Sequence, residues 1–183
     1  MSDRIPRLPL DAMPAPLAAA LRPRVARLGY LGEFFQCAAN APEALLAFQQ
    51  LTESLKAALP DRVTEVVALT VAARLGNDYE RHQHERLCRT LGLADEWIAA
   101  VEAGAPSGMA ALDDSDRAVQ HLTLALLARG GLGVQRELEA VIDRLGAAAA
   151  MAVLLLVGRY VTHALAVNAL QLAPPVASIF PAA

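Results

Sequence analysis

Aromatic residues are scarce in this chain of 183 residues. They make up 4% of it, although hydrophobic residues make up 55%. Alanine and leucine supply the difference, and such a composition suits closely packed helices. Stretches that alternate apolar and polar residues, the mark of β-strands, are also missing at any useful length. We therefore expect an all-α fold, and the length fits one domain with its own core.

Charge of one sign is not concentrated anywhere. The net charge is −3 and the signs are mixed, so neither nucleic acid nor an anionic membrane is an expected partner. Residues 147–157 form the longest apolar run, which is too short to cross a bilayer and predicts a core or subunit-interface helix. Asp3, Pro6 and Pro9 precede any apolar run. No signal peptide is therefore expected, and the predicted location is the cytoplasm.

Cysteine is nearly absent. Cys37 and Cys88 lie far apart in the sequence and form no Cys-x-x-Cys motif. We expect both to be buried thiols in a reducing compartment, with a disulfide between them as the alternative.

Prolines and glycines divide the chain into an arm at residues 1–13, a single helical domain at 14–172 and a tail at 173–183. Asn40 is expected to cap one helix, and Asn77 to cap another directly after Gly76 has ended the helix before it. A Gly/Pro loop follows residue 103. The helices are expected at about residues 14–28, 33–38, 42–59, 61–75, 78–91, 95–103, 114–129, up to 145, and 147–172.

The sequence contains a weak internal repeat. Residues 69–92 resemble residues 124–146 at a spacing of about 55. This pattern predicts either a duplicated helical hairpin or a chance similarity between Ala/Leu-rich helices. In both cases only the first copy carries ionisable residues suited to chemistry.

The segment from Asn77 to His84 is the most informative stretch. At about 100° per residue, Glu80 and His84 fall on the apolar side of the helix that follows Asn77, while most of its charged residues fill the opposite arc. A carboxylate and an imidazole on a buried face must be partnered or used. The sequence therefore predicts a functional site here.

The preceding helix adds a third group. Residues 63–73 are apolar almost throughout, and Glu65 is their only ionisable residue. A hairpin that turns at residues 76–77 would bring Glu65 to about the depth of His84, because both lie two to three turns from the bend. Glu65, Glu80 and His84 are thus expected to converge as a cluster that moves protons at neutral pH.

Each of these residues also has a purely structural interpretation. Asn77 at the N-cap and Glu80 three residues later fit a capping box, in which Glu80 bonds back to the Asn77 amide. His84 would then be a hydrogen-bonded core histidine, and Glu65 a buried partner. A metal site is not predicted, because His82 and His84 point about 160° apart on a helix. No cofactor is predicted either.

A second polar pair lies in the last helix. Tyr160 and His163 share a face and are flanked by Arg159. They are expected either to bond to each other within the core or at an interface, or to form a wall of the same pocket. By contrast, Arg81, Glu85 and Arg89 have the spacing of a solvated ladder of charges.

Glu65, the apolar helix after it, the run Asn77-Asp-Tyr79-Glu80, and His84 together resemble the carboxymuconolactone decarboxylase family of the alkylhydroperoxidase D superfamily. The resemblance covers about residues 40–105. It implies an alkylhydroperoxidase D-like helical domain built around a hairpin, a small-molecule substrate, and a homo-oligomer that is a trimer or a hexamer.

The peroxidase branch of this superfamily has Glu, then Cys-x-x-Cys, then His. By that resemblance the glutamate is Glu65 and the histidine His84, while Asn77 and Glu80 occupy the two cysteine positions. The thiol–disulfide chemistry of that branch is therefore not expected. Cys88 lies one turn beyond His84 and cannot replace both thiols.

The resemblance implies an acid–base enzyme that acts on a small organic acid or lactone, with Glu65, Glu80 and His84 as its catalytic residues. Asn77, Tyr79, Tyr160 and His163 are the expected substrate-binding residues. Arg74 and Arg159 are the only candidates for binding a carboxylate. The alternatives are a peroxidase-like protein that uses Cys88 as a single thiol and a non-enzymatic oligomeric binding protein.

Overall fold

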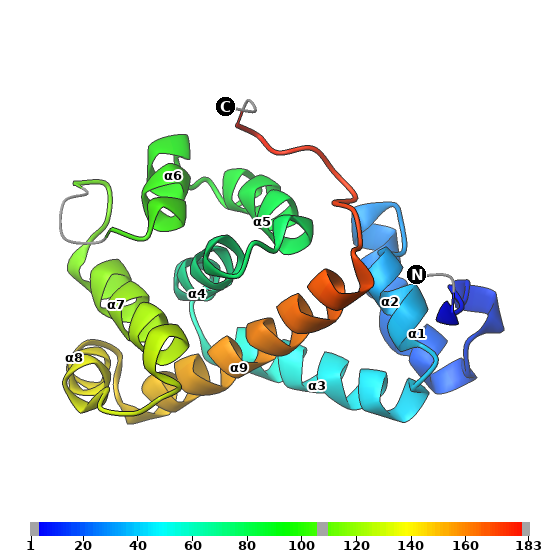
Figure 1. Ribbon diagram of the computed structural model, residues 1–183, viewed down its shortest axis with the longest axis horizontal. Helices are drawn as coiled ribbons and strands as arrows, with labels where there is room; N and C mark the ends of the chain where they lie inside the picture. Colours follow the sequence, from blue (N-terminus) through cyan, green and yellow to red (C-terminus); the bar gives the residue numbers. More distant parts are fainter. Residues whose placement is uncertain (1–3, 106–109, 181–183) are drawn as a thin grey trace.

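The computed structural model describes residues 4–105 and 110–180, and these residues form helices and no strand (Figure 1). Sequence and structure therefore agree on an all-α fold. A 3-10 turn at Leu10–Ala12 precedes nine α-helices in the described ranges. They are α1 (Ala15–Leu28), α2 (Glu33–Ala38), α3 (Pro42–Ala58), α4 (Asp61–Arg74), α5 (Asp78–Thr90), α6 (Asp95–Ala103), α7 (Asp114–Arg129), α8 (Gln135–Leu145) and α9 (Ala147–Leu170).

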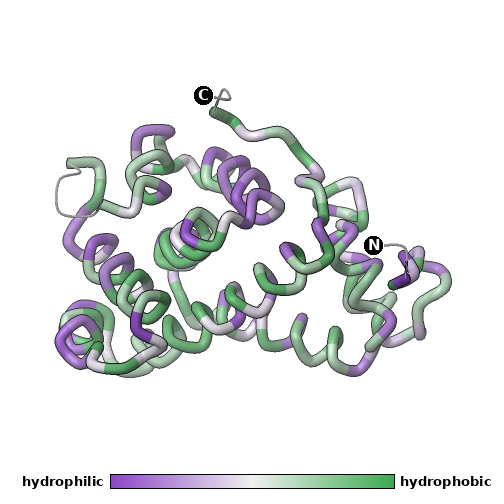
Figure 2. Tube along the Cα trace, in the orientation of Figure 1, coloured by the Kyte–Doolittle hydropathy of each residue, from purple (hydrophilic) through white to green (hydrophobic). Residues whose placement is uncertain are grey.

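Helix α4 lies at the centre of the molecule. Every residue from 63 to 72 is buried, as the nearly continuous apolar sequence predicts for a helix covered on all sides. Helices α5, α6, α7 and α9 surround it in Figure 1. In Figure 2 the α4 tube is mostly hydrophobic, whereas α5 beside it is mostly hydrophilic. A polar group between residues 63 and 72 of α4 is therefore shielded from bulk water.

Helix α9 agrees with the helix expected at residues 147–172 and extends well beyond the apolar run at residues 147–157. Its 24 residues meet the length and composition of a membrane span, and it is the only helix among the described residues that does. Its inner side packs against the core, as in the core helix of a globular fold. Its outer side carries three exposed apolar residues, Met151, Leu155 and Leu165.

The buried side chains form two clusters rather than one. The larger cluster joins helices α4 to α9. The smaller one is built from α1, α2 and the start of α3, and it also takes in Tyr79 and Val167. The N-terminal helices therefore pack as a separate layer against the hairpin of α4 and α5, and the boundary between the two clusters runs past Glu80 and His84.

The helix bounds agree with the expected ones to within about two residues, but one predicted cap is wrong. Asn40 does not cap α3: the N-cap residue is Ala41, which has no side-chain cap bond. The Asn40 amide instead donates to the carbonyl oxygens of Pro6 and Cys37, at 2.7 and 2.8 Å. It thus fastens the N-terminal arm to α2. The Gly/Pro loop lies partly at residues 106–109, outside the described residues.

The C-terminal segment, residues 171–180, returns along α5 and covers part of it (Figure 1). The prediction that Glu85 belongs to a solvated ladder is therefore wrong, because Glu85 has no exposed surface. Its Oε2 accepts hydrogen bonds from the Ser178 hydroxyl and the Ile179 amide, both at 2.7 Å. Helical periodicity alone does not reveal a segment that arrives from 90 residues away.

Candidate functional site

The hairpin between α4 and α5 positions the site. Gly76, with φ = 61°, occupies the left-handed conformation that a side chain disfavours, and it lets the chain reverse at the end of α4. Asn77 then caps α5, as predicted, because its Oδ1 accepts from the Glu80 amide at 3.2 Å. The reciprocal bond of a capping box is missing. The Glu80 carboxylate therefore has another role.

His84 lies between two carboxylates. Its Nδ1 is 2.6 Å from Glu65 Oε2, and its Nε2 is 3.1 Å from Glu80 Oε2. The Tyr160 hydroxyl lies 3.4 Å from the same Nε2. The three residues that we expected to converge are thus in contact, and Glu65 is 1% exposed while Glu80 and His84 are each 8% exposed. Glu65 fixes the imidazole from inside, and Nε2 is left on the outer side.

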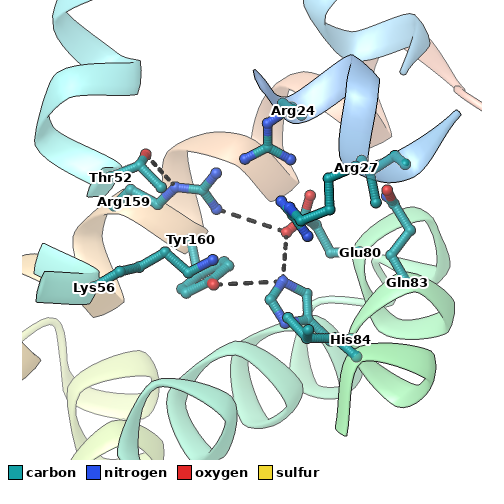
Figure 3. Close-up of a pocket in the computed structure, with 11 residues that line it drawn as sticks. Arg24, Arg27, Thr52, Lys56, Glu80, Gln83, His84, Arg159 and Tyr160 are labelled. Atoms are coloured by element: carbon teal, nitrogen blue, oxygen red, sulfur yellow. Dashed lines mark hydrogen bonds and ion pairs between the residues drawn. The ribbon is translucent and has the colours of Figure 1, made fainter. Parts of the chain in front are cut away.

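Glu80 has further neighbours from α9. Arg159 NH1 lies 3.6 Å from its Oε2, and His163 Nε2 lies 3.1 Å from its Oε1. The second contact is short but poorly aligned, so His163 makes no regular hydrogen bond. Arg159 is held in place by the Thr52 hydroxyl, which accepts from its Nε at 3.0 Å. The dashed lines in Figure 3 trace this chain from Thr52 to His84.

These contacts set the charges. Burial raises the pKa of Glu80, but nearby cations outweigh it and hold that pKa well below its usual range. The cations that act at neutral pH are His84 and Arg159, since burial lowers the pKa of His163 to about 4. Burial also lowers the pKa of His84, but Glu65 and then Glu80 raise it to about 9. At pH 7 the site therefore holds an imidazolium between two carboxylates.

Burial holds two other groups in their neutral forms. The pKa of the Tyr160 hydroxyl is raised well above its usual value, mainly by burial and despite Arg159. The pKa of the Cys88 thiol is raised by burial and by Glu65, whose Oε2 lies 3.6 Å from the sulfur. Cys88 has no exposed surface. It is therefore an inert thiol behind His84 rather than a reactive thiolate.

A small cavity opens onto this cluster (Figure 3). It offers about 50 Å³ to the centres of water molecules, which is room for a few waters. It lies where the N-terminal helices meet the α4–α5 hairpin and α9. Its lining residues are Arg24, Arg27, Leu28, Thr52, Lys56, Glu80, Gln83, His84, Leu87, Arg159 and Tyr160.

Four cations face this cavity: Arg24, Arg27, Lys56 and Arg159. Only Arg159 has an ion pair among the described residues, with Glu80. Burial lowers the pKa of Arg24, partly offset by Glu80. The cations outnumber the site's carboxylates, in a chain whose net charge is −3. Such a surplus of positive charge favours the binding of an anion.

Not every residue expected to bind substrate lies on the cavity. Tyr160 lines it, whereas Asn77, Tyr79 and His163 are not among its lining residues. Asn77 is the helix cap. The Tyr79 hydroxyl accepts from the Phe34 amide at 3.2 Å and approaches Gly32 so closely that a Cβ there would lie 2.6 Å from it.

His163 is fully buried behind Glu80. Its ring lies with its centroid 4.0 Å from that of Phe34. His163 therefore contacts a residue that lines the cavity, Glu80, without lining the cavity itself.

The cation candidates also differ from the expected ones. Arg159 lies at the site, but Arg74 lies at the far end of α4 beside Thr70 and Leu124. Sequence reasoning missed Arg24, Arg27 and Lys56. The grouping of Arg24 and Arg27 one turn apart on α1 was the available signal. Nothing in the sequence, however, says that α1 lies over α5.

Metal binding finds no support in the side-chain arrangement. Among residues 4–105 and 110–180, no three His, Cys, Asp or Glu side chains are grouped so as to hold an ion. Glu65, Glu80 and His84 are instead occupied with one another.

Comparisons with solved structures agree with this architecture. A comparison with curated proteins found no match. Among solved structures, the chain is similar to an alkylhydroperoxidase AhpD core, an uncharacterized peroxidase-related protein from Ralstonia eutropha JMP134. The TM-score is 0.79 at 16% identity, over 93% of this chain and 92% of that one.

A second similar structure is the debrominase Bmp8, as a cysteine-to-alanine variant in complex with 2,3,4-tribromopyrrole. The TM-score is 0.77 at 14% identity, over 92% of this chain and 90% of that one. At such identities these likenesses show the shared fold.

The model of the carboxymuconolactone decarboxylase family matches residues 40–121, a segment that contains Glu65, Glu80 and His84. The cavity residues from α1 and α9 lie outside it. The chain therefore has an alkylhydroperoxidase D-like fold, and its residues 40–121 are similar to the carboxymuconolactone decarboxylase family.

Proposed function

We propose that this protein is a lyase-type acid–base enzyme that acts on a small organic acid or lactone bearing a carboxylate. The observation that supports the proposal best is the position of His84. It is protonated at pH 7, held on one side by Glu65, and reaches a cavity ringed by cations on the other. A proton donor beside an anion-binding surface suits reactions in which carbon accumulates negative charge.

The proton steps follow from the charges. Loss of carbon dioxide from a carboxylate leaves an electron pair on carbon, as a carbanion or enolate. His84 gives that carbon the proton on Nε2, and the electron pair forms the new C–H bond. His84 then recovers a proton from solvent, so one proton is consumed for each carbon dioxide released. Glu65 keeps the proton on Nδ1 throughout, because it holds that nitrogen at 2.6 Å.

Glu80 and the cations have complementary roles in this scheme. Glu80 is ionised and lies 3.1 Å from His84 Nε2, so it holds the imidazolium in place. Arg159 and Lys56 lie on the opposite wall beside Tyr160 (Figure 3). There they are placed to bind a carboxylate or a developing enolate oxygen. The cavity must widen to admit such a substrate. One of its walls is α1, which belongs to the separate N-terminal cluster.

The two alternative functions find less support. A single-thiol peroxidase needs an accessible thiolate, but Cys88 is fully buried and burial raises its pKa. A scaffold without an active site predicts no cavity at Glu80 and His84, yet both line one. Thiol chemistry in relatives with this fold therefore does not transfer to this chain.

The proposal is tested by measuring turnover of a panel of small lactones and oxo-acids, with product detection by NMR. We expect Glu80→Gln and His84→Ala each to lower kcat about 10²- to 10⁴-fold. Glu96→Gln, at an exposed position of α6, is the matched control and should leave kcat unchanged. Activity should also fall as the pH rises through about 9, where His84 loses its proton. Undiminished turnover in both site variants would refute the assignment.

The assembly and the location stay predictions. A trimer or hexamer is implied by the resemblance, and the uncharged outer stripe of α9 with Met151, Leu155 and Leu165 is the surface we propose for self-association. Two copies can pair there without bringing like charges together. Sedimentation analysis of the native chain and of Leu155→Asp tests this, and an unchanged oligomer in the variant would exclude α9. The cytoplasmic location can be tested by cell fractionation.

A further inference from the structure

The outer face of α5 carries a second cluster of ionisable groups, and these groups do not line the cavity described above. We call residues 171–180 the C-terminal strap. Three side chains of α5 bind its backbone or its serine. His82 Nδ1 lies 3.1 Å from the Val176 carbonyl oxygen, and Arg86 donates to the Ala177 carbonyl oxygen at 2.9 and 3.1 Å. Glu85 accepts from Ser178 and Ile179 as described above.

Glu85 is the centre of this arrangement. Its Oε2 takes two hydrogen bonds from the strap, while its Oε1 is buried without a hydrogen-bond partner. Arg81 NH1 lies 3.7 Å from Glu85 Oε1 and 3.5 Å from Oε2 of Glu102 on α6. The two carboxylates therefore share one guanidinium, which Asp78 also binds at 2.7 Å. One Arg81 cannot compensate three carboxylates.

The shortage of positive charge has a simple solution. A proton held between Glu85 and Glu102 removes one negative charge and lets one carboxyl group donate to the other. Burial and then Glu85 raise the pKa of Glu102 to about 7, against the opposing effect of Arg81. The Oε1 atom of Glu102, like that of Glu85, is buried without a hydrogen-bond partner. One proton shared between the two carboxyl groups would give both of these buried oxygens a hydrogen-bond partner.

The strap borders an open surface groove at this point. The groove is lined by Asp78, Arg81, Glu102 and Phe180, together with alanines of α4 and α6. Phe180 comes from the strap, and its amide donates to the Ser178 hydroxyl at 3.0 Å. Residues 171–180 contain no titratable side chain. Any response of the strap to pH must therefore arise from α5 and α6.

We propose that the C-terminal strap is a pH-sensitive clasp, closed while Glu85 and Glu102 share a proton and loosened when that proton leaves. Two neighbouring buried carboxylates repel each other, and lifting the strap exposes them to water, which relieves the repulsion. The charged groups near the pair are Arg81, Asp78 and Arg89 on α5, and Arg74 at the end of α4, which lines a pocket together with Glu102. His82 and Arg86 face the strap itself. Neither His82 nor Arg86 contacts Glu102. They therefore bind the strap without a direct effect of the protonation of Glu85 and Glu102.

The test is hydrogen exchange of the Ile179 and Phe180 amides in the full chain at pH 6 and pH 8, measured by NMR. Comparison with Glu102→Gln at the same pH cancels the intrinsic effect of pH on exchange, and the amide of the variant mimics a permanently protonated acid. If opening returns Glu102 to the ordinary pKa of a glutamate, strap opening relative to the variant rises about tenfold between pH 6 and pH 8. A constant ratio would overturn the proposal.

Two further variants keep the result interpretable. His82→Gln should retain the tenfold response, since the clasp does not depend on histidine titration; loss of the response would contradict the proposal. Ser178→Ala removes one donor to Glu85. It should speed exchange at both pH values while leaving their ratio unchanged. Equal exchange in Ser178→Ala and the native chain at both pH values would show that Glu85 does not hold the strap.

Discussion

The hairpins α4–α5 and α7–α8 have similar sequences at a spacing of about 55 residues, but they differ in the charged groups that they bury. The first buries Glu65, Glu80, His84 and Glu85, whereas the second buries only Asp116, in the first turn of α7. At that spacing, Glu65 on α4 corresponds to Gln120 on α7. Both are fully or almost fully buried. Glu65 binds His84, whereas Gln120 donates to the Val101 carbonyl oxygen at 2.7 Å and lies near Thr70. The first contact is between ionisable groups and the second between neutral ones.

The second helix of each hairpin differs in the same way. Helix α5 buries Glu80, His84 and Glu85, whereas α8 buries only Val141. A buried neutral amide with one good bond stabilises packing and has no proton to move. Buried charges are costly unless paired, so the groups of α5 are retained with partners on α4 and α9. Of the two similar hairpins, only α4–α5 therefore holds a carboxylate–imidazole cluster that can transfer protons.

The largest expected effect comes from making α7 resemble α4. In Gln120→Glu, a carboxylate oxygen replaces the amide nitrogen that donates to Val101, at a position with no exposed surface. We expect a loss of about 4 kcal/mol in the free energy of unfolding at pH 7.5, and a smaller loss at pH 5, where the new carboxyl is protonated. Urea denaturation at both pH values measures this.

The matched control for that variant is Gln135→Glu at the exposed start of α8, which should change stability by less than about 0.5 kcal/mol. Equal costs at the two positions would mean that burial of Gln120 does not govern the difference between the hairpins.

The next effect comes from making α4 resemble α7 with Glu65→Gln. The pKa of His84 is raised to about 9 in the folded chain, above its ordinary value of 6.5. The corresponding stability is fully present below pH 6.5 and is lost as the pH rises through about 9. The native chain should lose on the order of 3 kcal/mol across this window.

In Glu65→Gln most of this pH dependence should disappear, because the main group that raises the pKa of His84 is gone. Thermal or urea denaturation between pH 6 and pH 10 measures it. The control is Gln120→Ala, which should lower stability without altering the pH dependence. A native chain whose stability is flat from pH 6.5 to 9 would argue against a protonated His84.

The smallest effects concern the helix caps. Asp113 and Asp116 form a complete capping box at α7, with bonds of 2.8 and 3.2 Å. Asn77 supplies only half of one at α5, because the Glu80 carboxylate is turned to His84. We expect Asp113→Ala to cost about 1.5 kcal/mol and Asn77→Ala about 1 kcal/mol. Urea denaturation measures both losses of stability. A larger loss in Asn77→Ala than in Asp113→Ala would indicate that Glu80 also caps α5.

Much of the hairpin could be predicted because its signals are local. Gly76 and Asn77 are a stop and a cap next to each other, and helical periodicity puts Glu80 and His84 on one face. The apolar sequence of α4 leaves Glu65 no water to reach. A short turn between two helices then fixes their relative depth, so the meeting of Glu65 with His84 followed from spacing.

The remainder depends on contacts between distant segments. Glu85 lies on the charged arc of α5, and only the strap makes it buried. Tyr79 was expected in the pocket, but its hydroxyl is taken by the Phe34 amide. Arg24 and Lys56 reach the cavity because α1 and α3 pack against α5 and α9. The periodicity of one helix does not predict which distant helix will pack against it.

The sequence by itself determined the helices, the α4–α5 hairpin and the carboxylate–imidazole pairing within it. These depend on neighbours in the chain, on turn residues and on the period of the α-helix. The tertiary structure alone decided which side of that pairing meets a cavity, which cations surround it and where the strap covers α5. Those features arise from the packing of segments 50 to 110 residues apart, where burial and charge depend on which surfaces meet.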